Sequence, residues 1–174
     1  RLEQWFRSPQ AILKYLTTLF PIKRALIPAN PHVGEVPEFH VATAAQLPAL
    51  LTARLETLTA KGIPPEDIAI VSMRSIKKSA LYGLDSLGGF RLSSFTGQYS
   101  PEGEQLWSEG EILLDSIYRF KGSQKPFVFL VDVDADSMTD DVVRRVYCGM
   151  TRATLGVELF MTPQFETVLR NSLA

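Results

Sequence analysis

The sequence predicts one α/β domain, residues 1–174, built around a mostly parallel β-sheet. Short apolar runs without polar alternation recur along the chain, which is typical of strands covered on both faces. Segments with helical spacing of apolar residues lie between several of these runs, as expected where helices join parallel strands. The predicted strands are residues 68–72, 112–114, 127–131 and 157–161.

Composition excludes some classes of protein and leaves others open. The 18 basic side chains nearly balance the 19 acidic ones, so a role in binding nucleic acid has to rest on local basic clusters. Cys148 is the only cysteine, which excludes an internal disulfide and fits a reducing compartment. No apolar run approaches the roughly 18 residues of a membrane span, so we expect a cytoplasmic protein without a membrane partner.

The amino-terminal residues 1–35 are expected to form one helix and a connecting segment. Ser8 is a suitable N-cap and Pro9 a suitable first helical residue, and apolar residues then follow with helical spacing. Four prolines in residues 21–37 indicate a connection over the surface, with a short strand at 36–41. The chain starts with arginine rather than methionine, and we expect it to be part of a longer protein.

The core of the domain, residues 36–174, contains the clearest predicted helix. Thr43 and Gln46 have the spacing of a capping box, in which each side chain bonds a free N–H group at the helix start. Gly62 is placed to end this helix in the left-handed conformation. The inward stripe of the helix is expected to be Leu47, Leu50, Leu51, Leu55 and Leu58.

Two further helices are expected near the carboxyl terminus, after an irregular segment. Residues 83–110 contain six glycines and show no strong period. A helix with Asp140 and Asp141 in its first turn is expected to follow, because acidic residues suit the positive end of the helix dipole. The last helix is expected to start at Thr162. Its predicted inward residues are Phe165, Val168, Leu169 and Leu173.

A polar and basic turn, residues 118–122, follows the predicted strand that starts at residue 112. Ligands of open parallel sheets bind at such carboxyl ends of strands. Gly122 lets the backbone approach an anion closely, and Arg119 and Lys121 beside it favour phosphate. A further arginine, Arg152, lies in a tight connection before the last predicted strand, where its planar guanidinium can reach a phosphate.

Three segments with this chemistry resemble motifs IV, V and VI of the UvrD/Rep-type superfamily 1 helicases. Residues 68–74 are similar to motif IV, an apolar strand followed by an arginine. Residues 116–124 (SIYRFKGSQ) are similar to motif V, and residues 144–153 (RRVYCGMTRA) to motif VI, the most specific match of the three. The resemblance covers roughly residues 36–161. It implies the second RecA-like domain of such a helicase, a three-layer domain that lacks its own P-loop.

The resemblance assigns two arginines to the hydrolysis of ATP. Arg152 would be the arginine finger of motif VI, which neutralises charge that develops on the γ-phosphate of ATP bound to the neighbouring domain. Arg74 would be the motif IV arginine on the same phosphate, with Gly122 and Lys121 nearby. Gln124 stands where the family has a glutamate that contacts the ribose.

The same resemblance implies a nucleic-acid contact at Ser116, Tyr118 and Arg119. Tyr118 replaces the family's histidine near single-stranded DNA and keeps the ability to stack on a base. Met73 replaces a tyrosine that stacks on adenine, which implies a weaker or altered base contact. Gln124 keeps its hydrogen bonding but lacks the charge of the family's glutamate. These departures indicate either a divergent branch of the family or a degenerate one.

No P-loop of the form G-x-x-x-x-G-K-[ST] is present, so this chain does not itself cradle the β- and γ-phosphates. Residues 129–132 have the form of a Walker B strand, but the resemblance makes them the strand after motif V. The alternating aspartates of residues 132–136 have calcium-loop spacing. Ser137 stands where glycine is required and Val143 where glutamate belongs, so we expect no metal ligand there. ATP with Mg²⁺ is expected to be bound mainly by a preceding P-loop domain.

The main hypothesis is therefore the second motor domain of an ATP-dependent DNA helicase or translocase. Its expected partners are single-stranded DNA or a DNA duplex junction, and the P-loop motor domain of the same polypeptide. The interval from Arg74 to Ser116 is too short for the large subdomain that the family usually carries, which indicates a trimmed helicase. Two alternatives stay open: a non-catalytic RecA-like module that binds DNA or a partner protein, and a stand-alone α/β nucleotide-binding domain.

Overall fold

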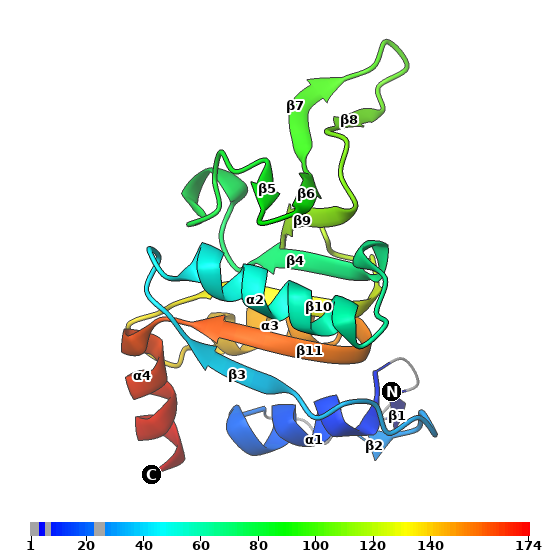
Figure 1. Ribbon diagram of the computed structural model, residues 1–174. Helices are drawn as coiled ribbons and strands as arrows, with labels where there is room; N and C mark the ends of the chain where they lie inside the picture. Colours follow the sequence, from blue (N-terminus) through cyan, green and yellow to red (C-terminus); the bar gives the residue numbers. More distant parts are fainter. Residues whose placement is uncertain (1–3, 6–7, 23–26) are drawn as a thin grey trace.

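A seven-stranded β-sheet forms the centre of the computed structural model, which describes residues 4–5, 8–22 and 27–174 (Figure 1). Neighbouring strands of this sheet pair in parallel, except that β5 runs antiparallel to β6 at one edge. The α/β prediction with a mostly parallel sheet is therefore confirmed. In spatial order the strands are β3 (Glu38–Val41), β11 (Ala153–Met161), β10 (Lys125–Val133), β4 (Ile68–Ser72), β9 (Ile112–Ser116), β6 (Phe90–Ser93) and β5 (Ser86–Leu87).

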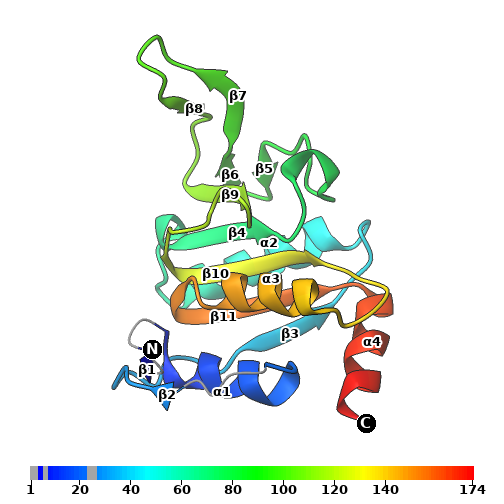
Figure 2. The ribbon, with the colours of Figure 1, turned by 180° about the vertical axis from the view of Figure 1, so that it is seen from behind.

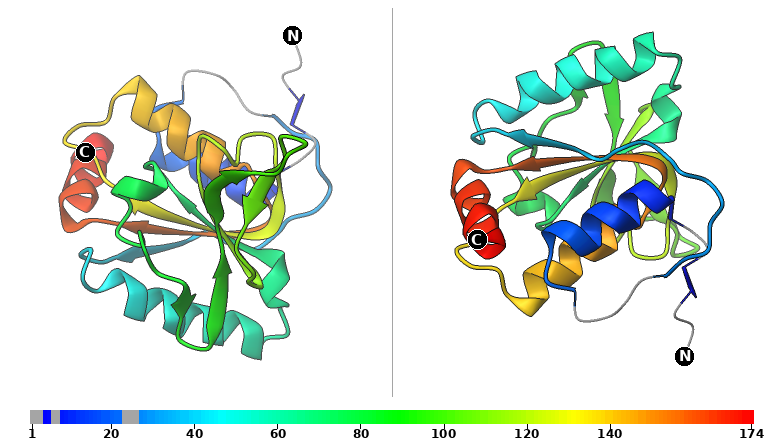
Figure 3. Two further views of the ribbon diagram at one scale, coloured as in Figure 1. Left: turned by 90° about the horizontal axis from the view of Figure 1, so that it is seen from above. Right: turned by 90° about the horizontal axis from the view of Figure 1, so that it is seen from below.

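Helices cover both faces of the sheet and make it the middle of three layers (Figures 2 and 3). α2 packs on one face, whereas α1 and α3 pack on the other and α4 joins them beside the end of β11. Among the described residues, no helix has the length and apolar character needed to cross a membrane. The helices are α1 (Gln10–Leu19), α2 (Leu47–Ala60), α3 (Asp140–Met150) and α4 (Pro163–Leu173), with short 3₁₀ turns η1 (Pro65–Asp67) and η2 (Ile76–Lys78).

The residues of β4 alternate between two apolar cores. Ile68 and Ile70 pack on the side of α2, and Ala69 and Val71 pack on the side of α3. All four are fully buried, because helices cover both faces of this central strand. This burial explains why the segment is continuously apolar in sequence, as expected for a strand of a parallel sheet.

The predicted capping box and the predicted end of α2 are both present, but the box closes the turn that precedes α2, which begins at Leu47 with Gln46 as its N-cap. The main-chain N–H of Thr43 donates to Oε1 of Gln46 at 3.0 Å, and the N–H of Gln46 donates to Oγ1 of Thr43 at 3.4 Å, which are the reciprocal bonds of a capping box. At the other end Gly62 has a φ of 91°, the left-handed conformation that stops a helix without a Cβ clash.

The two terminal helices differ from the predictions in detail. α1 begins at Gln10 with Pro9 in the N-cap position, so the assignments of Ser8 as the cap and of Pro9 as the first helical residue are both wrong. The buried Ser8 hydroxyl donates instead to the main-chain oxygen of Thr151 at 3.2 Å, a long-range bond that a local pattern does not reveal. In α4, Leu173 is 51% exposed rather than inward, because the buried stripe ends at Leu169.

A projecting hairpin replaces the irregular segment expected at residues 83–110. β7 (Phe95–Tyr99) and β8 (Gln105–Trp107) pair in antiparallel fashion and extend away from the main sheet (Figures 1 and 2). The ring of Phe95 packs against those of Tyr99 and Trp107, with centroids 5.4 and 6.1 Å apart. Both faces of this hairpin are largely exposed, so its sequence lacks the apolar alternation that indicates a strand.

A small parallel pair lies near the amino terminus. β1 (Gln4–Trp5) pairs with β2 (Ile27–Pro28), which falls in the stretch expected to be a connection. Residues 23–26 of that stretch lie outside the described part of the chain. The short strand expected at 36–41 is present as β3 and forms the edge of the main sheet.

Candidate functional site

The segments that resemble motifs IV and V meet at the carboxyl ends of β4 and β9, whereas the segment that resembles motif VI ends just before β11. Ser72 and Ser116, the last residues of these two strands, are register partners. Arg74 and Tyr118 follow them by two residues each, so they start from adjacent points on one edge of the sheet. This edge is where open parallel sheets bind ligands.

A basic groove lies along α3, with a volume of about 380 Å³. The connection between β9 and β10 forms one wall, and the exposed face of α3 forms the other. The α3 residues recur at intervals of three or four, as one helical face requires. Four cationic side chains and one carboxylate give the groove an excess of positive charge that suits an anion. Its lining is Ile117, Tyr118, Lys121, Asp141, Arg144, Arg145, Cys148 and Arg152.

The end of α3 brings Arg152 to the surface of this groove. Gly149, Met150, Thr151 and Ala153 are buried, whereas Arg152 is partly exposed. A Cβ at Gly149 would lie 2.6 Å from Cδ1 of Leu130 in β10, so glycine is what allows α3 to approach the sheet this closely. In the sequence GMTRA at the end of α3, four residues are therefore packed in the core, and the guanidinium of Arg152 reaches the surface.

The Arg152 guanidinium is held on one side. Its Nε donates to the main-chain oxygen of Cys148 at 3.2 Å, and the Arg152 oxygen accepts from the N–H of Lys125 at 3.1 Å. Among the described residues, no side chain pairs with the terminal nitrogens of Arg152. These nitrogens form the planar fork that binds phosphate oxygens in pairs.

The two arginines within α3 differ in their surroundings. Arg145 forms an ion pair with Asp141 at 3.0 Å, and its Nη1 donates to the main-chain oxygen of Met73 at 3.3 Å. Arg144 is exposed on the same groove. Arg145 therefore joins α3 to the end of β4, while Arg144 faces solvent.

The other predicted phosphate-binding residues lie on the β9–β10 connection. Lys121 lines the groove together with Arg152, and Gly122 and Gln124 are exposed on the same connection. Gly122 has a φ of 95°, and a Cβ there would meet nothing within 4 Å. Glycine is thus required by the backbone conformation rather than by crowding, and it leaves an open approach to the main chain.

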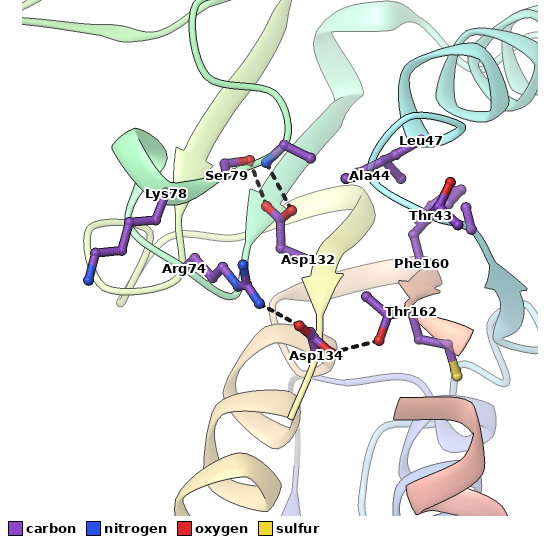
Figure 4. A pocket seen from close by; sticks show the side chains of 13 residues that line it. Thr43, Ala44, Leu47, Arg74, Lys78, Ser79, Asp132, Asp134, Phe160 and Thr162 are labelled. Carbon is purple, nitrogen blue, oxygen red and sulfur yellow. Dashed lines mark hydrogen bonds and ion pairs between the residues drawn. The ribbon is translucent and has the colours of Figure 1, made fainter. Parts of the chain in front are cut away.

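Arg74 does not share the groove with Arg152. It lines a second cavity of about 230 Å³ at the ends of β3, β4, β10 and β11, together with Lys78, Asp132 and Asp134 (Figure 4). Its Nη2 forms an ion pair with Oδ2 of Asp134 at 2.5 Å. Arg74 and Arg152, the two predicted catalytic arginines, therefore line two separate cavities.

The predicted nucleic-acid contacts are unequal in exposure. Tyr118 is 63% exposed and lies at the mouth of the basic groove. Ser116 is only 6% exposed, and its hydroxyl accepts from the main chain of Arg119, which argues against a direct contact with DNA. The Arg119 guanidinium lies 4.0 Å from the centre of the Phe95 ring, and its Nε is 3.7 Å from Asp115. Arg119 thus ties the turn to the base of the hairpin.

Met73 lies inside the core rather than on the surface. Its side chain is 2% exposed and belongs to the apolar cluster on the side of α3. A nucleobase cannot stack on a side chain that is enclosed in this way, so the adenine contact expected from the motif is not supported. This burial could not be predicted from the sequence, because a methionine that follows a strand is compatible with either a buried or an exposed position.

An ion-pair cluster that was not predicted from the sequence lies between β3, β11 and α2. Arg54 donates to Oε2 and Oε1 of the buried Glu158 at 2.8 and 2.9 Å, and lies 2.8 Å from Glu38. His40 Nε2 is 2.8 Å from the same Glu158 carboxylate. Burial alone would raise the pKa of Glu158, but the bonds from His40 and Arg54 outweigh it and lower that pKa. The sequence indicates this cluster only through Glu158, which is a single carboxylate within the apolar segment of β11.

Comparison with known proteins agrees with this geometry. Residues 111–159, which run from β9 through α3 into β11, match the family model of the UvrD-like helicase C-terminal domain. Among solved structures, the fold is similar to the C-terminal domain of a possible DNA helicase from Lactobacillus plantarum WCFS1. That similarity has a TM-score of 0.62 at 14% sequence identity, and covers 94% of this chain and 93% of that one. The search of curated proteins gives no match. The resemblance to UvrD-like helicases and the RecA-like fold are confirmed.

Proposed function

We propose that this chain, which resembles UvrD-like helicase C-terminal domains, is the second motor domain of an ATP-dependent DNA helicase or translocase. The observation that carries the proposal is Arg152. It emerges at the end of a basic groove within the segment that matches the helicase family, and its terminal nitrogens have no partner among the described side chains. In this role Arg152 neutralises charge that develops on the phosphate in the transition state.

The residues present fit part of an ATP site. The excess positive charge of the groove suits phosphate, and Gly122 leaves the main chain open to close approach. Among the described residues, only the Glu38, His40 and Glu158 group has the spacing of a metal site, and Arg54 already pairs with both of its carboxylates. ATP with Mg²⁺ is therefore assigned mainly to the P-loop domain of the same polypeptide.

Single-stranded DNA is the proposed second ligand. Tyr118 offers an exposed ring for stacking on a base, and Lys121 and Arg144 lie beside it for the phosphate backbone. Opening and closing of the cleft between the two motor domains would move the strand across both. Alone, these 174 residues are expected to hydrolyse ATP negligibly, because they contain no P-loop.

The test is Arg152→Ala in the full-length protein, with DNA-stimulated ATP turnover as the readout. Arginine fingers contribute about 10³-fold or more, so turnover is expected to fall by at least that factor. Arg170→Ala is the matched control, since it removes an exposed arginine of α4 that pairs with Glu166 and lies outside the groove. If the Arg152→Ala protein kept turnover within about threefold of the wild type, the arginine-finger assignment would be wrong.

A non-catalytic module that binds DNA or a partner protein is the second candidate. The burial of Met73 favours it, because the family's adenine contact is then lacking on this domain. The amino-acid sequence that precedes residue 1 in the full-length protein discriminates between the two. An intact P-loop and Walker B motif support the motor, whereas eroded ones support the module.

A further inference from the structure

The three alternating aspartates after residue 131 are each bound by a different part of the protein. Asp132 accepts from the end of β4 and from the segment after it, Asp134 from Arg74 and Thr162, and Asp136 from Gln164. Their spacing resembled a calcium loop, but in this structure protein donors take up the carboxylates. The first two surround the cavity that contains Arg74 (Figure 4).

Asp132 fixes the backbone on which Arg74 is carried. Its Oδ2 accepts from the hydroxyls of Ser72 and Ser79 at 2.6 Å each, and its Oδ1 accepts from the N–H of Ala80 at 3.1 Å. The Ser72 hydroxyl accepts in turn from the N–H of Arg74 at 3.0 Å. The segment that follows β4 is thus fastened to the end of β10 on both sides of η2.

The backbone of Asp132 has an unusual conformation. Its φ of 54° makes it the non-glycine residue with positive φ in the described part of the chain. The β10–β11 register also shifts between Leu130 and Val133, around this residue. L-residues adopt this region rarely, and such outliers persist where the surroundings hold them, often next to functional sites. Asp132 has this backbone conformation, and its carboxylate accepts the three hydrogen bonds from Ser72, Ser79 and Ala80.

Asp134 fixes the side chain of Arg74. Its Oδ2 pairs with Nη2 of Arg74 at 2.5 Å, and its Oδ1 accepts from Oγ1 of Thr162 at 2.7 Å. Thr162 is the N-cap of α4, where the same Oγ1 accepts from the N–H of Phe165 at 3.1 Å. The guanidinium is therefore connected through one carboxylate to the rigid start of a helix.

The location of this network agrees with a role at a ligand site. β4 and β10 are neighbours in the sheet, but the chain leaves β4 towards β5, at the edge beyond β9 and β6, and leaves β10 towards β11 on the opposite side. Ligands of doubly wound sheets bind outside the carboxyl ends of strands at such a divergence. Arg74 is 44% exposed there, so a phosphate can reach the guanidinium from solvent.

We propose that Asp132 and Asp134 are positioning residues for Arg74, and that they hold its guanidinium with one terminal nitrogen engaged and the other presented to phosphate. This inference rests on the proposed function, in which Arg74 contacts the γ-phosphate of ATP. Asp132 fixes the position of the Arg74 main chain through Ser72, and Asp134 fixes the position of the Arg74 guanidinium. Small displacements of a charged group reduce catalysis strongly, so the effect belongs to turnover rather than to substrate binding.

The experiment is steady-state ATP hydrolysis by the full-length protein with saturating single-stranded DNA. Asp134→Asn keeps the size of the side chain and removes its charge. We expect kcat to fall about tenfold while KM changes less than threefold. Asp136→Asn is the matched control, because the same chemical change two residues away touches Gln164 rather than Arg74. It is expected to stay within twofold of the wild type.

A double-mutant cycle separates positioning from a general structural role. If Asp134 acts through Arg74, then Asp134→Asn has no further effect in the Arg74→Ala protein, within about twofold. Thr162→Val removes the bond to Asp134 and is expected to lower kcat in the same direction, whereas Thr162→Ser keeps the hydroxyl and restores it. Thermal unfolding of each variant checks that the fold is retained.

Two results would overturn the inference. One is wild-type kcat, or a higher one, in a folded Asp134→Asn protein, and the other is a full Asp134→Asn effect that persists without Arg74. In both cases Arg74→Ala would still lower turnover if the proposed function holds. If Arg74→Ala itself left turnover unchanged, the role of Arg74 would fail together with the inference.

Discussion

Replacing Glu158 with glutamine removes a buried charge that joins two strands and a helix. The Glu158 side chain is 4% exposed, and it pairs with Arg54 and His40 at 2.8 Å each. Removing one partner of a buried ion pair costs about 3–5 kcal/mol. Arg54 keeps Glu38 at 2.8 Å and is 19% exposed, so it is not left unpaired. We therefore expect a cost just below that range, about 2–3 kcal/mol.

The assay for Glu158→Gln is thermal and urea unfolding at neutral pH. For a domain of this length, 1 kcal/mol lowers the melting temperature by about 2–4 °C, so a decrease of about 5–10 °C is expected. Glu166→Gln is the matched control, since it breaks the exposed i,i+4 pair with Arg170 and should cost at most about 0.5 kcal/mol. If both variants lowered the melting temperature equally, the energetic role of the buried cluster would be refuted.

The same cluster predicts how stability depends on pH. Desolvation raises the pKa of Glu158, but hydrogen bonds from His40 and Arg54 lower it by more, so the net shift is downward from 4.5. A carboxyl group with a lowered folded-state pKa stabilises the fold above its unfolded pKa, and that stabilisation is lost as the pH falls. Wild-type stability is therefore expected to decrease below about pH 4.5, and Glu158→Gln should flatten this part of the curve.

Three other changes test the site and its packing. Gly122→Ala places an L-residue at a φ of 95° and should lower stability by about 1–2 kcal/mol, measured by urea unfolding; an unchanged midpoint would mean that the turn can relax. Gly149→Ala would bring a Cβ to 2.6 Å from Leu130 and should cost about 1–3 kcal/mol by overpacking, with a neutral result showing that α3 can move outward. Tyr118→Ala should weaken binding of an oligo-dT strand at least fivefold while Tyr118→Phe retains it, measured by fluorescence anisotropy, and equal affinities would exclude stacking there.

Local patterns determined much of the fold. The Thr43–Gln46 capping box, the left-handed Gly62 and the apolar run of β4 each depend on residues close together in sequence, and the structure confirms all three. The Ser8 cap failed because a partner 143 residues away binds its hydroxyl. The β7–β8 hairpin was not predicted because its strands bury little surface. A strand is recognised in sequence by the alternation of apolar and polar residues, and that alternation arises only where one face is buried.

The candidate site was predictable only in part. The sequence motifs identify Lys121 and Arg152, and the structure places both on one groove. The partners with which the charged side chains pair could not be predicted, because pairing depends on distances between elements that are far apart in the sequence. The sequence does not reveal that Asp134 binds Arg74, or that Arg119 lies over Phe95. The burial of Met73 likewise depends on how α1 and α3 cover that face of the sheet.

In the proposed function, Arg152 acts on the transition state of phosphoryl transfer. The most direct measurement compares the affinity of the full-length protein for ADP with its affinity for ADP and aluminium fluoride, which mimics the transferring phosphoryl group. An arginine finger contributes to the second complex and hardly to the first. Arg152→Ala is expected to weaken the aluminium fluoride complex about 100-fold or more and to leave ADP affinity within threefold. Equal losses of affinity for both ligands, or no loss for either, would show that Arg152 is not an arginine finger.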